Sequence, residues 1–414
     1  MTQHTASSPR PSDDPKVTLR SPADLAAALP YLCGFHPDDS ILMIALHGER
    51  GRFGGRARLG IPRNPGEWPD AAVQLADCLV TGSTQRGARP DAIVLFLVQD
   101  PAAGESPGQV MERLRPLAQG LRVACGSLDV PVVEALCVSA GRWWSYSCPA
   151  TECGPPEGVV VPPSGDSVMA AAAAYAGIRV RGSRKELEDR LTPPPAGSPA
   201  TVAREEALDA AAAGLVPRML EHDDSDEVRR TTLKLLKEAL DRFKAASPED
   251  DGPIGDRRDD TLLSDDEAAA MILGLQDRDT RDRAAEWMDP PHTDPALRLW
   301  RALARRCVEP YHEHAAAPLT LAGWVAWSAG DEATARVAFG RALHLAPDYT
   351  FARLLYAAVN NGISPEPLRR YLRRRRSGQA RRAAILTARR GPAGSAGRGP
   401  GRRSPGARRA RTRR

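Results

Sequence analysis

The sequence has 414 residues, of which 42% are apolar and 26% are charged, and this ordinary globular usage excludes a wholly disordered chain. Because a single core rarely grows beyond about 300 residues, the length predicts two domains. The net charge of +5 is unevenly distributed: residues 373–414 hold 16 arginines and no acidic residue, and subtracting them leaves −11 for residues 1–372. Unspecific attraction to polyanions is therefore expected only near the C-terminus.

Neither export nor membrane insertion is expected. Met1 to Pro15 lacks the apolar core of a secretory signal. The alanine-rich stretch from Val168 to Ile178 is much shorter than the roughly 18 apolar residues of a membrane span. Seven cysteines, an odd number, favour reduced thiols over a disulfide framework. We expect a cytoplasmic protein.

The first half shows the periodicity of a mixed α/β domain over residues 17–192, preceded by a disordered segment, residues 1–16. A capped helix begins at Ser21 and Pro22 and is expected to end near Leu29, before Pro30. The expected strands are a buried central strand at 41–46, its antiparallel partner at 56–61, and further buried strands at 92–98 and 132–138. Helices are expected around residues 72–80 and 109–124, with Pro116 kinking or shortening the second.

The second half has helical periodicity only. A proline-rich linker at 193–200 leads into a helical domain at 201–372, in which the polar segment 247–260 is predicted to be a disordered loop. Within this domain, residues 321–347 resemble a tetratricopeptide helix pair, with a turn at Gly330 and Asp331. Since about three repeats are needed for stability, the pair predicts a short helical bundle with flanking helices at 294–308 and 349–360.

Three separated motifs resemble one known family. Residues 19–40, which contain Leu-Pro-Tyr-Leu-Cys-Gly-Phe-His-Pro-Asp-Asp-Ser, and residues 141–158, which contain Gly-Arg-Trp-Trp-Ser-Tyr, are similar to signatures of an actinobacterial family catalogued as domain of unknown function 4192. Residues 324–347 resemble its C-terminal part. The resemblance covers residues 17–372 and implies no activity. The arginine-rich tail lies beyond it, and Gly154 stands where the resemblance implies a second cysteine after Cys153.

The segment Gly34 to Ser40 is the first candidate site. His36 could act as an acid or a base, and Asp38 and Asp39 could orient it or bind a cation. The structural alternative, which the residue types favour, is a turn in which Gly34 supplies an unusual backbone angle and the aspartates bond local backbone groups.

The second candidate site is Arg142, Trp143 and Trp144. The rings could stack against a flat ligand while Arg142 holds a phosphate or carboxylate. Alternatively, adjacent tryptophans on an extended segment point to opposite faces and pack into two cores, and this alternative is slightly favoured.

No metal site, cofactor or catalytic residue is predicted. Cys148 and Cys153 have a spacing that can close around zinc, but the sequence offers no second ligand pair, so packed or redox-sensitive thiols are favoured. Walker-type, GxGxxG, GxSxG and HExxH motifs are all missing from the sequence. Whether the protein is an enzyme stays open.

Residues 373–414 form an arginine-rich tail that is predicted to be disordered, because it cannot bury a core. Arg373, Arg374, Arg375, Arg376, Arg402 and Arg403 are its candidate nucleic-acid contacts, since dense positive charge releases counterions from phosphates. The alternative is a weakly constrained extension, and composition does not choose between the two.

Three functions follow, of which the first is favoured. In it the protein is non-catalytic: the α/β domain senses a small ligand, and the helical domain binds an unknown protein partner. The second is an enzyme of unknown class, with a cleft between the His36 loop and the segment Arg142-Trp143-Trp144. The third is a nucleic-acid-associated factor that acts through its tail.

Overall fold

The computed structural model describes residues 19, 21–85, 87–147, 155–162, 170–171, 180, 182–246 and 252–389. The predicted α/β half followed by a helical half is confirmed. The chain divides into two compact units, residues 1–366 and residues 367–414. The expected disordered N-terminus at 1–16 lies outside the described residues.

The first half contains one mixed sheet with the strand order β2-β1-β3-β4-β5-β6. β3 and β4 are parallel, and every other neighbouring pair is antiparallel. Its strands are β1 (Ser40–His47), β2 (Arg52–Gly60), β3 (Ala92–Val98), β4 (Val132–Ser139), β5 (Arg142–Ser145) and β6 (Val159–Val160), and its helices are α1 (Pro22–Cys33), a 3₁₀ turn (Pro65–Glu67), α2 (Trp68–Gln85) and α3 (Pro107–Ser127).

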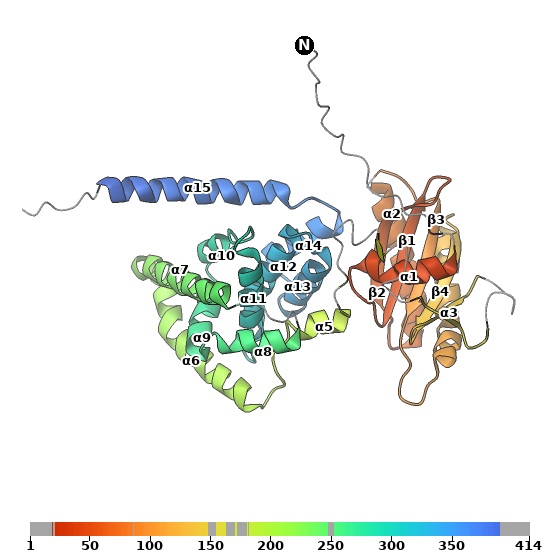
Figure 1. Ribbon diagram of the computed structural model, residues 1–414, viewed down its shortest axis with the longest axis horizontal. Coiled ribbons are helices and arrows are strands. Elements are labelled where there is room, and N and C mark those ends of the chain that lie inside the picture. The colour runs from red at the N-terminus through yellow and green to blue at the C-terminus, as the bar shows by residue number, and fades with distance from the viewer. Residues whose placement is uncertain are drawn as a thin grey trace, which may run out of the picture. The chain divides into compact units, whose positions relative to one another are not determined.

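Both faces of the sheet are covered, which explains the unbroken apolar sequence of its central strands. In β1, Ile41 and Met43 pack on the face covered by α2 and α3, whereas Leu42 and Ile44 pack on the opposite face with α1. Figure 1 shows α1 lying across this second face. The predicted central strand is therefore confirmed, and alternate side chains divide between two cores.

Two helices differ from their expected limits at prolines. α1 continues through Pro30 to Cys33, and the Gly34 N–H then donates to the Pro30 carbonyl at 2.8 Å. α3 continues through Pro116, which is exposed. Pro116 lies on the solvent side of α3, where solvent can reach the backbone carbonyl that lacks a partner, and Pro30 lies buried in the last turn of α1, so neither proline ends its helix at once.

The second half is helical throughout the described residues. Its elements are α5 (Arg184–Asp189), α6 (Pro199–Leu220), α7 (His222–Ala245), α8 (Pro253–Thr261), α9 (Asp265–Gly274), α10 (Arg278–Ala284), α11 (Thr293–Ala304), a 3₁₀ turn (His312–Ala315), α12 (Ala316–Ser328), α13 (Glu332–Leu345), α14 (Thr350–Asn360) and α15 (Glu366–Arg389). The helix pair expected at 321–347 is confirmed as α12 and α13, flanked by α11 and α14 as predicted.

Close packing joins α12 to α13. A Cβ atom at Gly323 would lie 2.5 Å from the Phe339 ring, so only glycine permits this approach. Trp324 is fully buried, and its indole N–H donates to the Ala285 carbonyl at 2.9 Å. Asp331 caps α13 by accepting from the Thr334 N–H. The small residues seen in the sequence therefore serve helix packing, as expected.

Contacts cross the proline-rich segment at 193–200, so the two halves belong to one compact unit. The Gly34 backbone approaches α13 so closely that an added Cβ would lie 2.8 Å from the Ala333 Cβ. Arg56 on β2 forms a 3.6 Å ion pair with Glu332 on α13. The α/β half is thereby tied to α13, which lies beyond the predicted linker.

Two segments predicted to be disordered are helical instead. Residues 253–260 of the predicted loop at 247–260 form most of α8, and residues 373–389 of the predicted tail at 373–414 lie in α15. Pro253 suits the first position of α8, and arginines from other segments neutralise its aspartates. Arginine, alanine, leucine and glutamine favour the helix in α15. The rest of both segments lies outside the described residues.

Cys78 is exposed, whereas Cys125 and Cys137 are buried, and burial raises the pKa of both buried thiols to about 11. At pH 8 only about one in a thousand of such thiols is ionised, and the thiolate is the nucleophile. We expect iodoacetamide to alkylate Cys78 at least ~100-fold faster than Cys125 or Cys137 in the folded protein, as measured by mass spectrometry of the peptides. Similar alkylation rates for the three thiols are expected only after unfolding in urea. Equal rates in the native state would contradict the burial of Cys125 and Cys137.

Candidate functional site

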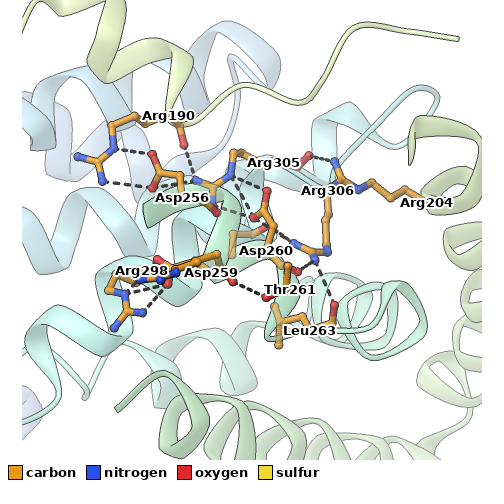
Figure 2. Close-up of polar contacts among 12 residues, drawn as sticks. Arg190, Arg204, Asp256, Asp259, Asp260, Thr261, Leu263, Arg298, Arg305 and Arg306 are labelled. Atoms are coloured by element: carbon orange, nitrogen blue, oxygen red, sulfur yellow. Dashed lines mark hydrogen bonds and ion pairs between the residues drawn. The ribbon is translucent and has the colours of Figure 1, made fainter. Parts of the chain in front are cut away.

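Three aspartates of α8 meet arginines from other segments (Figure 2). Asp256, Asp259 and Asp260 are spaced i, i+3 and i+4, which places them on neighbouring lines of the helix. Arg190 follows α5, Arg298 lies on α11, and Arg305 and Arg306 follow α11. We call these seven residues the α8 network.

Arg305 bonds both a carboxylate and two backbone carbonyls. Its side chain is only 7% exposed. Nε and Nη2 donate to the Asp260 carboxylate at 2.8–3.3 Å, Nη1 donates to the Arg190 carbonyl at 2.8 Å, and Nη2 also donates to the Asp256 carbonyl at 3.1 Å. One guanidinium group thereby joins the ends of α5 and α11 to α8, since its rigid fork presents donors in several directions.

Arg306 approaches the same carboxylate. Its Nη1 donates to Asp260 Oδ1 at 3.3 Å and to the Ala302 carbonyl at 3.2 Å, and its Nη2 donates to the carbonyls of Asp260 and Leu263. The Arg306 side chain is 4% exposed. The Asp260 carboxylate therefore lies between two buried guanidinium groups and compensates the charge of both.

Two further pairs complete the network. Arg298 holds Asp259 in a bidentate pair and donates to the carbonyls of Phe243 and Ala246 at 3.0 and 2.8 Å. Arg190 holds Asp256, with 2.7 Å between Nε and Oδ2 and 3.2 Å between Nη2 and Oδ1. Bidentate pairs fix orientation as well as charge, so α8 is held rigidly although its sequence is polar.

Arg204 on α6 borders the network. Its Nη1 donates to the Arg305 carbonyl at 3.1 Å, and its Nε lies 3.7 Å from Asp265. Burial lowers the pKa of the Arg204 guanidinium from its usual value, and the positive charge of Arg306 lowers it further. Positive charge is thus crowded here, and each nearby carboxylate compensates more than one arginine.

A cavity of about 580 Å³ lies beside the network. Asp256, Asp260, Arg190 and Arg305 form part of its wall. The remaining lining residues are Val180, Gly182, Glu186, Leu187, Asp189, Thr192, Pro193, Pro194, Gly252, Pro253 and Arg257. Its volume falls within the range of small-molecule sites, and an apolar wall with a few fixed polar groups is typical of such sites.

The His36 loop lies next to this cavity but does not supply the predicted side chains to it. Gly182, whose carbonyl accepts from the His36 N–H, is a lining residue, whereas His36, Asp38 and Asp39 are not among the residues that line the cavity. The His36 side chain is exposed. The Asp38 carbonyl accepts from the Ser40 hydroxyl, and Asp39 Oδ1 accepts from Gln99 Nε2 at 3.1 Å.

The geometry at Gly34 agrees with the structural alternative, whereas the Asp39 carboxylate bonds the distant Gln99 side chain and not a local backbone group. Gly34 has a φ of 82°, as the turn chemistry predicted, and a Cβ at Gly34 would lie 2.8 Å from the Ala333 Cβ. Glycine is therefore required both for the left-handed conformation and for the approach of α13.

Arg142, Trp143 and Trp144 do not converge with the His36 loop. Trp143 packs in the core under α1, and Trp144 packs in the core under α2 and α3, so the two rings lie on opposite faces of the sheet. Both rings are buried. The Arg142 Nη1 donates to the carbonyls of Glu157 and Gly158 at 3.3 and 2.9 Å. The core-packing alternative accounts for the two tryptophans, and the Arg142 guanidinium bonds backbone carbonyls.

The other predicted contacts are placed as follows. Arg373, Arg374, Arg375 and Arg376 lie in α15, whereas Arg402, Arg403, Cys148 and Cys153 lie outside the described residues. In the part of the chain that the structure describes, no group of three or more His, Cys, Asp or Glu side chains is arranged to hold a metal ion.

Sequence reasoning missed the α8 network because charged composition was taken as a sign of solvation. One available signal was the spacing of Asp256, Asp259 and Asp260 after Gly252-Pro253, which is that of a helix with one acidic side. The other was the pair Arg305-Arg306 at the end of a strongly amphipathic helix. Neither signal indicates that α8 and the residues after α11 come into contact.

Comparison with known families gives one match. The family model described as "Domain of unknown function (DUF4192)" matches residues 22–366. No curated protein and no solved structure matches the chain. Among the described helices, none combines the length and the apolar character needed to cross a membrane.

Proposed function

The chain belongs to the family described as domain of unknown function 4192, and from that premise we propose that it is a non-catalytic protein that binds a small amphiphilic molecule in the cavity beside α8. The cavity carries this proposal. Its volume of about 580 Å³ suits a small organic ligand. The ligand's apolar part would lie against Leu187, Pro193 and Pro194.

The charges around the cavity support a binding role. Asp256 and Asp260 accept hydrogen bonds from Arg190, Arg305 and Arg306, so their oxygens are engaged within the protein. Such groups orient and compensate charge rather than shuttle protons. Asp189 and Arg257 are exposed at the same cavity and supply both signs of charge for a polar group of the ligand.

Two residues that belong both to the cavity wall and to the α8 network support a sensing role. Arg190 and Arg305 line the cavity and also tie α5, α8 and the end of α11 together. A ligand that binds only the folded arrangement stabilises it in proportion to its occupancy. Occupancy of the cavity would therefore be communicated to the packing of three helices.

A protein partner for the helical half and a cytoplasmic location remain parts of the proposal. Leu220 on α6, Ile254 on α8 and Leu354 on α14 are 82%, 59% and 63% exposed. Because they lie on three different helices, they define a partner surface less well than the cavity defines a ligand site. The five described cysteines are free thiols, which suits a reducing compartment.

The experiment uses three probes that share a phenyl ring and differ in charge: benzoate, benzyl alcohol and benzamidine. We expect at least one to give saturable binding to the full chain by ligand-observed NMR. Pro194→Trp places an indole in the cavity and should abolish this binding. Pro195→Trp is the matched control, because Pro195 is exposed and does not line the cavity.

The probes also reveal the charge that the site prefers. Binding that is lost in Pro194→Trp and kept in Pro195→Trp supports the proposal. Absence of saturable binding for all three probes, or equal binding to both variants, would overturn it.

A further inference from the structure

The helix α15 is unusually basic and independent of the cavity. Over Glu366–Arg389 it contains nine arginines and a single acidic residue, Glu366. Arg370, Arg373, Arg374 and Arg376 are exposed, and so is Tyr371. Seven of the sixteen arginines in residues 373–414 therefore lie on a regular helix.

The exposed arginines of α15 cover about half of its circumference. At 100° per residue, Arg373 and Arg376 lie along one line and Arg370 and Arg374 along a neighbouring one, whereas Leu372 lies on the other side and is 5% exposed. An amphipathic helix that lies in a membrane interface needs an exposed, continuous apolar face. The exposed side of α15 over these residues is basic rather than apolar, which argues against a lipid surface as its partner.

A duplex groove matches the charge of α15. A helix within the major groove has phosphates on both flanks and acceptor-rich base edges in front, so exposed arginines over about half of the helix circumference find partners. The major groove of duplex RNA is too deep and narrow for such a helix.

We infer that α15 docks in the major groove of duplex DNA and binds it through its phosphates. Residues 1–372 carry a net charge of −11 and are repelled by DNA, so the basic segment carries the attraction. Each phosphate that an arginine neutralises releases condensed counterions, which gives an affinity that falls steeply with salt. No base-specific contact is required.

The test compares two variants of the full chain that lose equal charge. R373Q/R374Q/R375Q/R376Q removes four arginines from α15, and glutamine preserves helix propensity. R402Q/R403Q/R408Q/R409Q removes four arginines beyond α15. Binding of a fluorescent random-sequence 20-base-pair DNA is measured by anisotropy between 50 and 300 mM NaCl.

We expect the α15 variant to bind on the order of 100- to 1,000-fold more weakly at 0.1 M salt, with the slope of log K against log salt reduced by about three to four. The distal variant should lose less than a tenth of that effect. Equal losses in the two variants would show that charge alone matters and would overturn docking by α15.

Two further titrations decide the partner class. A duplex RNA of the same sequence and vesicles of phosphatidylcholine with 30% phosphatidylserine are each titrated against the intact chain. Binding of either that is tighter than binding of duplex DNA would overturn the assignment. Failure of the cavity probes has no bearing on this result, because α15 contributes no residue to the cavity.

Discussion

Replacing Asp260 with alanine should lower the free energy of unfolding by about 3–5 kcal/mol, which is the usual cost of removing one partner from a buried ion pair. The Asp260 carboxylate compensates both Arg305 and Arg306, whose side chains are 7% and 4% exposed. Its removal leaves the two buried guanidinium groups with only the more distant carboxylates of Asp256, 3.5 Å from Arg305, and Asp265, 3.4 Å from Arg306. Urea denaturation followed by circular dichroism measures the change.

Two comparisons make this prediction specific. Asp241→Ala removes an exposed aspartate of α7 and should change the stability by less than about 0.5 kcal/mol. The triple variant D260A/R305M/R306M removes both under-compensated guanidinium charges together with the carboxylate, so it should recover part of the loss. A loss below about 1 kcal/mol for Asp260→Ala would mean that water reaches the two arginines.

Replacing Trp324 with alanine should cost a similar amount, about 3–5 kcal/mol, for a different reason. The Trp324 ring is fully buried between α12 and its neighbours and lies edge-on to Trp327 at 5.8 Å. The substitution leaves a cavity and also deprives the Ala285 carbonyl of its 2.9 Å hydrogen bond. Thermal and urea unfolding of the full chain measure the loss.

The two contributions at Trp324 can be separated. Trp324→Phe keeps most of the ring volume and removes the N–H, so its cost should be about 1–3 kcal/mol. Leu354→Ala on α14 is the matched apolar control, since Leu354 is 63% exposed, and it should stay within about 0.5 kcal/mol. A Trp324→Ala variant as stable as the control would contradict the packing described for α12.

Apolar periodicity predicted most of the fold because it records which residues leave water. The unbroken apolar segments at 41–46 and 92–98 became β1 and β3, buried on both faces. The Trp324 to Pro347 pattern became α12 and α13. Short segments were not predicted. The strand β6 has only two residues, which are too few to show any periodicity.

The candidate site could be predicted only in part. Turn chemistry at Gly34 and the opposite orientation of Trp143 and Trp144 follow from local rules, and the structure agrees with both. The α8 network does not follow from them, because its ion-paired side chains lie 39 to 66 residues apart in sequence. A charged segment can be buried only where side chains of opposite charge from other parts of the chain pair with it, and otherwise it stays solvated.

The sequence by itself determined where sheet gives way to helix, which helices pair, and that positive charge collects at one end of the chain. Those properties depend on side-chain period and on net charge, which are local or additive. Only the tertiary structure decided that α8 is an ordered helix, that its aspartates hold Arg190, Arg298 and Arg305, and that a cavity lies beside them. Those outcomes depend on groups that are distant in sequence coming together in low-dielectric surroundings, where the electrostatic attraction within an ion pair is stronger than in water.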